Sequence, residues 1–129
     1  MLGDKCRKAL ADIRQRRRMR RGTTPTITLT VTNEDNSPLD LTNDEVYITF
    51  KESGSNGSLL TKRETDDGVS ITVNGNASIV EVTLTQAETL GFRPGRTVSV
   101  QIRAKDADVA IATDIGHFDA EEILLDGEI

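Results

Sequence analysis

The chain has 129 residues, 36% of them hydrophobic, with a single cysteine, no tryptophan and a formal net charge of −5. This length fits one domain, or one domain with an arm. One cysteine cannot form an internal disulfide, no apolar stretch approaches the about 20 residues of a membrane-spanning helix, and the basic N-terminus lacks the apolar core of a signal peptide.

The charge divides the chain into two unlike parts. Residues 1–21 contain nine Lys or Arg and two Asp, a net charge of +7, whereas residues 22–129 carry a net charge of −12. The first part has no Pro or Gly between residues 4 and 20, and its apolar side chains fall on one helical face: Cys6, Ala9, Leu10 and Ile13. We predict a basic N-terminal arm over residues 1–21, with a short helix, and a separate domain over residues 22–129.

An alternative interpretation makes most of the arm a leader. Met19 follows the run Arg16-Arg17-Arg18, and tandem AGG arginine codons spell a bacterial ribosome-binding sequence. Residues 1–18 would then lie upstream of a natural start at Met19. The coding DNA distinguishes the two interpretations, because without AGG triplets at these arginines the leader hypothesis has no basis.

From residue 22 onward, apolar and polar residues alternate in short runs, which is the period of β-strands. In the first run Ile27, Leu29 and Val31 alternate with threonines, which predicts a strand over residues 26–32 with a hydroxyl-bearing outer face. The later runs predict strands over residues 46–51, 59–64, 69–73, 77–84, 98–105 and 109–115, the last with a register slip near Gly116. Turn sequences such as Asn74-Gly75 and Pro94-Gly95 separate these runs.

A single helical segment interrupts the strands. Thr85-Gln86-Ala87-Glu88 has the form of a capping box, in which the threonine hydroxyl and the glutamate carboxylate satisfy free backbone amides at a helix start. Gly91 follows at a suitable distance to end the segment. We predict one helical turn near residues 86–91.

About seven short strands with regular turn signals indicate an all-β fold, an immunoglobulin-like antiparallel β-sandwich. A closed barrel is the alternative. The Cys–Trp–Cys core of antibody domains is absent, since the chain has one cysteine and no tryptophan, so any relation is architectural.

No residue pattern predicts catalysis or a cofactor. His117 is the only histidine, Cys6 lies in the arm, and neither a nucleophile elbow nor a phosphate-binding glycine loop occurs. Acidic residues gather in the loops, namely Glu34, Asp35, Asp40, Asp44, Glu45, Asp66, Asp67, Asp106 and Asp108. None of these groups has the spacing of an EF-hand, so we favour solvated acids over calcium ligands and predict no catalytic, cofactor or metal residues.

Five segments of the β domain carry a resemblance to a known group of proteins. They are residues 21–26, 45–50, 84–90, 101–103 and 123–129, with the sequences RGTTPT, EVYITF, LTQAETL, QIR and ILLDGEI. Together they resemble small prophage-encoded structural proteins of Gram-positive bacteria and, more distantly, the N-terminal domain of phage baseplate upper proteins. The resemblance covers residues from Arg20 to the end and excludes the arm.

The resemblance implies a non-enzymatic virion structural protein, assembled in the bacterial host cytoplasm and associated with the tail or baseplate. The receptor-binding segments of longer baseplate proteins are absent, which favours an assembly or adaptor module that contacts other phage structural proteins, as a homo-oligomer or in a larger assembly. The alternative is a head-associated decoration or connector protein whose basic arm contacts DNA. Membrane binding is disfavoured, because the arm has too small an apolar face.

Three groups of residues are candidates for partner binding. The arginine fork suits carboxylates on an acidic partner, including a neighbouring copy, and it also suits nucleic acid phosphates. The threonine face offers hydroxyls to a neighbour, although such faces are usually solvated. The apolar C-terminal residues either close the core, which we favour, or dock on a partner. The candidates are Arg16, Arg17, Arg18, Arg20, Arg21, Thr26, Thr28, Ile123, Leu124 and Ile129.

Overall fold

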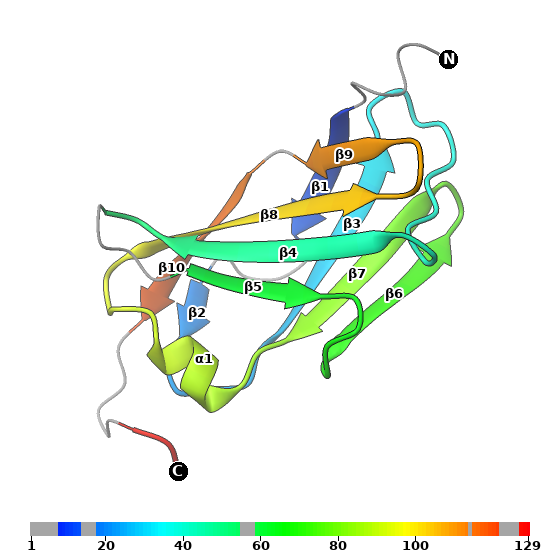
Figure 1. Cartoon of the computed structure of the whole chain (residues 1–129). Coiled ribbons are helices and arrows are strands. Elements are labelled where there is room, and N and C mark those ends of the chain that lie inside the picture. The colour runs from blue at the N-terminus through cyan, green and yellow to red at the C-terminus, as the bar shows by residue number, and fades with distance from the viewer. Residues whose placement is uncertain (1–7, 14–17, 55–58, 114, 122–126) are drawn as a thin grey trace.

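The computed structural model describes residues 8–13, 18–54, 59–113, 115–121 and 127–129, and for residues 8–13, 18 and 19 it describes the backbone only. The described residues form ten strands and one short helix (Figure 1). In chain order these are β1 (Lys8–Ile13), β2 (Arg18–Arg20), β3 (Thr26–Asn33), β4 (Glu45–Glu52), β5 (Leu59–Arg63), β6 (Val69–Asn74), β7 (Ala77–Thr83), α1 (Gln86–Leu90), β8 (Thr97–Lys105), β9 (Ala110–Thr113) and β10 (Gly116–Glu121).

The strands form two layers, which confirms the predicted all-β sandwich. In the front layer of Figure 1, β5 pairs with β4 and β4 with β8, while β9 and β10 pair with the other side of β8, all antiparallel. In the back layer the order is β1-β3-β7-β6, also antiparallel. A short parallel pairing of β1 with β9 joins the layers along one side. Among the described strands β5 does not pair with β6, so the sheets do not close into a barrel.

Strict alternation on four strands builds the core between the layers. The inward side chains of β3, β4, β7 and β8 are at most 3% exposed, because every second residue of a strand points to the same face. The apolar ones among them are Ile27, Leu29, Val31, Val46, Ile48, Phe50, Val80, Val82, Val98, Val100, Ile102 and Ala104. Phe92, from the segment after α1, and Phe118, from β10, are also buried and lie in the same cluster.

The predicted N-terminal helix is wrong wherever the structure describes the arm. Lys8–Ile13 is strand β1 and Arg18–Arg20 is strand β2. An isolated helix of this length is marginal in water, whereas β3 and β9 offer β1 unpaired backbone groups on both sides. The rest of the predicted helix lies outside the described residues.

The strand predicted over residues 109–115 is the shorter β9, and a further strand, β10, follows it after the register slip that the sequence indicated near Gly116. Ala112 pairs with Arg103, but Gly116 pairs with Val100, so four residues on this segment oppose three on β8. The extra residue reverses the inward face, as in a β-bulge. Ile115, which the alternation placed inward, is therefore 54% exposed.

The predicted helical turn is confirmed as α1, with its capping box. The Glu88 amide donates to Thr85 Oγ1 at 3.1 Å, and the Thr85 amide donates to Glu88 Oε1 at 2.8 Å. The Glu88 carboxylate also accepts from Lys62 Nζ at 2.8 Å, which attaches α1 to β5. This capped turn places the following segment, residues 91–96, at one end of the sandwich (Figure 1).

Candidate interaction surfaces

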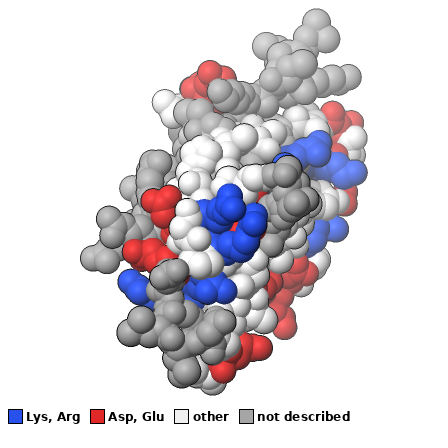
Figure 2. Space-filling view, turned by 90° about the vertical axis from the view of Figure 1, so that its left-hand side faces the viewer, with Lys and Arg blue, Asp and Glu red and all other residues white. Residues whose placement is uncertain are grey.

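Two guanidinium groups lie side by side at the end of the sandwich near α1. Arg93 and Arg96 flank Pro94-Gly95, and the positive φ of Gly95 (75°) fits the third position of a type II turn. Both guanidinium groups lie beside Gly54, in the loop after β4. A methyl group placed on the Gly54 Cα would be 3.6 Å from Arg96 Nη1 and 3.7 Å from Arg93 Nη2. Figure 2 faces this end and shows Lys and Arg side chains near its centre, with Asp and Glu side chains around them. We call residues 93–96 the arginine turn.

A buried carboxylate fixes the arginine turn. Glu52, the last residue of β4, is only 1% exposed. Its Oε1 accepts hydrogen bonds from the Arg93 backbone amide at 2.7 Å and from Arg93 Nε at 3.0 Å. A buried carboxylate requires such partners, and its attraction holds the half-exposed Arg93 side chain in one orientation. The sequence does not indicate this pair, because Glu52 continues the inward alternation of β4 at a position where an apolar residue is expected.

The arginines of the arm divide by role. Arg21 supports α1: its Nε donates to the Phe92 carbonyl and its Nη2 to the Leu90 carbonyl at 3.2 Å. Arg20 is exposed and forms a long ion pair with Glu121 on β10, at 3.6 Å. The backbone of Arg18 belongs to β2. The side chain of Arg18, like the whole of Arg16 and Arg17, lies outside the described part of the structure.

The threonine face is part of a continuous sheet. Thr26 is exposed, and its hydroxyl shares a 2.8 Å hydrogen bond with that of Thr83 on β7. Thr28 is half-buried and pairs with Glu81 in the register of β3 with β7. Since β3 lies between β1 and β7, this surface is a sheet face and not a free edge.

The C-terminal candidates are only partly described. Ile123 and Leu124 lie outside the described residues. Ile129 is 91% exposed, so it does not close the core as the sequence analysis favoured. Instead its backbone pairs with the side chain of Gln86: the Ile129 amide donates to Gln86 Oε1 at 2.8 Å, and Gln86 Nε2 donates to the Ile129 carbonyl at 3.3 Å. These polar contacts attach the chain end to the first turn of α1.

The opposite end of the sandwich carries an acidic hollow of about 210 Å³. Asp40, Asp44 and Asp106 line it together with Asn33 of β3 and with apolar residues from the front sheet and from loops. Hydrogen bonds from the Thr42 hydroxyl and amide lower the pKa of Asp40, and those from the Asp108 and Val109 amides lower the pKa of Asp106. Burial raises the pKa of Asp44, and the charges of Asp106 and Asp40 raise it further. The hollow therefore concentrates negative charge.

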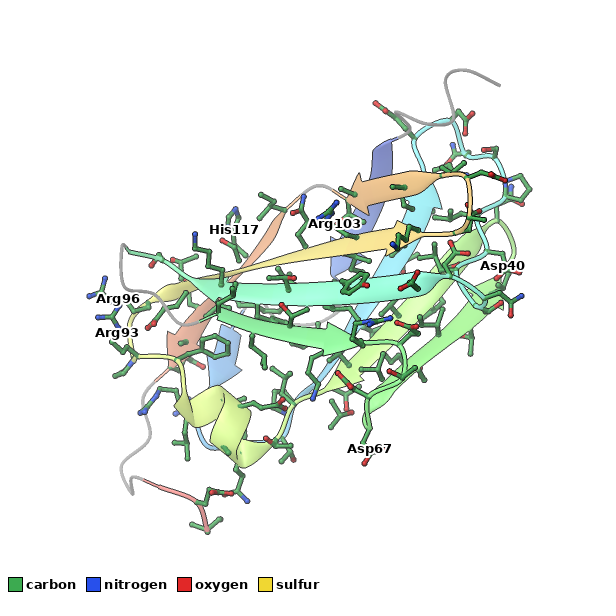
Figure 3. The ribbon with its side chains drawn as sticks, in the orientation of Figure 1. Asp40, Asp67, Arg93, Arg96, Arg103 and His117 are labelled. Carbon is green, nitrogen blue, oxygen red and sulfur yellow. The ribbon has the colours of Figure 1, made fainter. Side chains whose placement is uncertain are left out.

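A second hollow, of about 380 Å³, lies on the outer side of the front sheet. Tyr47, Thr49, Thr61 and Arg103 are among the residues that line it. The Arg63 guanidinium carbon lies 4.3 Å from the centre of the Tyr47 ring and covers one face of it. His117 stands on the same sheet (Figure 3), and its Nδ1 shares a 3.1 Å hydrogen bond with the Ser99 hydroxyl.

Two further features were sought in the described part of the chain. No group of three or more His, Cys, Asp or Glu is placed to hold a metal ion there. None of the helices described is long and apolar enough to cross a membrane. Compared with known proteins, the chain matches no protein-family model and no curated protein.

Proposed function

We propose that this protein is a non-enzymatic phage virion structural protein, an assembly or adaptor module of the tail or baseplate that acts through protein–protein contacts. The resemblance of its strand and cap segments to prophage structural proteins motivates the virion context. The arginine turn is the observation that best supports action by contact, because two guanidinium groups stand together at one end of a sandwich.

The arginine turn suits an acidic protein surface. A guanidinium presents planar, paired donors that match a carboxylate. Glu52 holds Arg93 in place before any partner arrives, so binding immobilises fewer side-chain rotamers and loses less entropy. Arg96 has no hydrogen bond or ion pair from its side chain to any described residue, so its charge is available to a partner.

A protein partner is favoured over DNA, the target in the alternative of a head-associated decoration or connector protein. Arg21 holds the carbonyls of Leu90, at the end of α1, and of Phe92, and Arg20 forms an ion pair with Glu121. The chain as a whole is acidic, with a net charge of −5. It would repel a polyanion such as DNA everywhere except at the end that carries the arginine turn. DNA binding is therefore an outcome of the test below and is not the proposal.

The test begins with particles induced from cells that carry the gene and purified by density gradient. We expect mass spectrometry to find the chain in intact particles at a fixed ratio to the major structural proteins, and cross-linking to join the arginine turn to an acidic segment of a neighbour. Absence of the chain from purified particles would overturn the proposal. Salt-dependent binding of duplex DNA by the full chain, lost on removal of residues 1–21, would favour the head-associated alternative.

A further inference from the structure

The two ends of the sandwich are complementary in charge. Figure 3 places Arg93 and Arg96 at one end and Asp40 at the other. Asp40 lines the acidic hollow together with Asp44 and Asp106. Neither end neutralises the other within one copy, since the strands of the sandwich lie between them (Figure 3).

Asn33, one of the residues that line the hollow, has an unused hydrogen-bond acceptor. Asn33 is fully buried and lies in the inward alternation of β3, next after Ile27, Leu29 and Val31. Its Nδ2 donates to the Ser37 carbonyl, the Ser37 hydroxyl and the Pro38 carbonyl, at 3.2, 3.0 and 3.1 Å. Because all three partners accept, the amide orientation is fixed. Asn33 Oδ1 has no hydrogen-bond partner among the described residues.

The Asn33 side chain faces the hollow. Ala104 and Ile111, on the inward faces of β8 and β9, line the hollow together with Asn33. The alternation of β3 directs the Asn33 side chain to that same interior space. Buried acceptors are normally satisfied, so an unpaired oxygen at this place indicates a missing donor.

The chemistry of the hollow favours a guanidinium group. Carboxylates and an amide oxygen are all acceptors, so the ligand must donate hydrogen bonds and carry positive charge. The acids described in the structure are not arranged in a set of three that holds a metal ion. A guanidinium has five N–H donors spread over a plane, which lets it reach several separate acceptors at once.

We propose that the acidic hollow receives an arginine of the arginine turn from a second copy of this chain, so that copies associate head to tail. The inference rests on the proposed function in one respect, that the protein acts by protein contact, and it names the partner as the chain itself. Charge complementarity between the two ends supports a second copy as the occupant. Such an interface is heterologous, so successive copies form a ring if the rotation closes and a filament if it does not.

Two variants test the two ends of the sandwich separately. Arg96→Glu reverses the charge at the arginine turn and leaves the Arg93–Glu52 pair in place. Asp44→Lys places a positive charge among the acids of the hollow and removes no hydrogen bond that a described residue makes with this carboxylate. Arg103→Glu and Asp67→Lys are matched controls, because both residues are exposed and lie away from the two ends (Figure 3). Circular dichroism of each variant verifies that it folds.

The experiment is sedimentation velocity of the full-length chain over a concentration series. We expect the wild type and both controls to associate, and Arg96→Glu and Asp44→Lys each to remain monomeric alone. Mixed together, these two variants retain one wild-type pair of ends between them, so the mixture should regain the association that neither variant shows alone. A monomeric wild type would overturn the inference, as would association that survives either variant or a mixture that stays monomeric.

A second measurement tests the hollow directly in the folded protein. We expect methylguanidinium chloride to shift the Asn33 side-chain amide signals in NMR spectra of Arg96→Glu, and to shift them far less in Asp44→Lys. Equal shifts in both variants would overturn the assignment of the hollow. If copies do not associate but the chain is found in particles, the head-to-tail inference fails and the proposed function stands. If copies associate but particles lack the chain, the proposed function fails and the head-to-tail inference stands.

Discussion

Glu52 offers the sharpest test of how the fold supports the arginine turn. Its carboxylate is 1% exposed and accepts two hydrogen bonds from Arg93. Glu52→Gln keeps the size and shape of the side chain and removes its charge. The amide oxygen still accepts both bonds, but as a neutral acceptor.

The expected loss follows from the number and type of these bonds. A hydrogen bond to a charged group contributes about 1.5–3 kcal/mol net and a neutral one about 0.5–1.5 kcal/mol, so two bonds lose roughly 2 kcal/mol. The Arg93 side chain is half-exposed, and solvent screening reduces its share. We expect Glu52→Gln to lower the free energy of unfolding by about 1–2 kcal/mol.

Urea denaturation measures this loss, with an unchanged dependence on denaturant showing that the compactness of the two states is unaltered. Glu45→Gln is the matched control. Glu45 is half-exposed, with ion pairs of 3.6 Å to Arg63 and 3.7 Å to Lys105 and a 3.3 Å hydrogen bond from the Tyr47 hydroxyl that an amide oxygen can also accept, so we expect a change below about 0.5 kcal/mol. If Glu52→Gln costs no more than Glu45→Gln, the buried carboxylate does not stabilise the fold and our account of the arginine turn is wrong.

Three further perturbations test other parts of the structure. Thr85→Ala removes the cap of α1 and should cost about 1 kcal/mol in urea denaturation, and an unchanged midpoint would contradict the capping role. Asp44→Asn should raise the free energy of unfolding at neutral pH by up to about 0.5 kcal/mol. The raised pKa of Asp44 means that its negative charge opposes folding above that pKa. The gain in the free energy of unfolding should therefore disappear in acid, where the wild-type carboxyl is neutral. A gain that persists in acid would refute its electrostatic origin. A chain that starts at Met19 lacks β1, so amide hydrogen exchange should accelerate in residues 29–33 of β3, which pair with it, and less in β6; unchanged exchange would mean that β1 does not protect β3.

The sequence determined the strands of the sandwich because their physical cause is local. Alternation of apolar and polar residues fixes which face of a strand is buried, whatever the strand's neighbours are. The capping box at Thr85 and Glu88 likewise acts within four residues, and α1 begins where it predicts. The register slip before Gly116 also has a local cause. One extra residue in this segment changes which residues face inward, so Phe118 is buried and Ile115 is exposed.

The tertiary structure decided what depends on partners distant in sequence. The arm has helical spacing, yet its described residues form β1 and β2 because strands about 20 and 100 residues away present unpaired backbone groups to them. Glu52 and Arg93 are in contact although they are 41 positions apart in the sequence. The acidic hollow likewise brings together Asn33, Asp44 and Asp106 from three separate parts of the chain. In the sequence each of these residues looks like an ordinary polar or charged surface residue. Only folding brings them close enough for burial and charge to act between them, and so creates the two ends on which the proposed contacts depend.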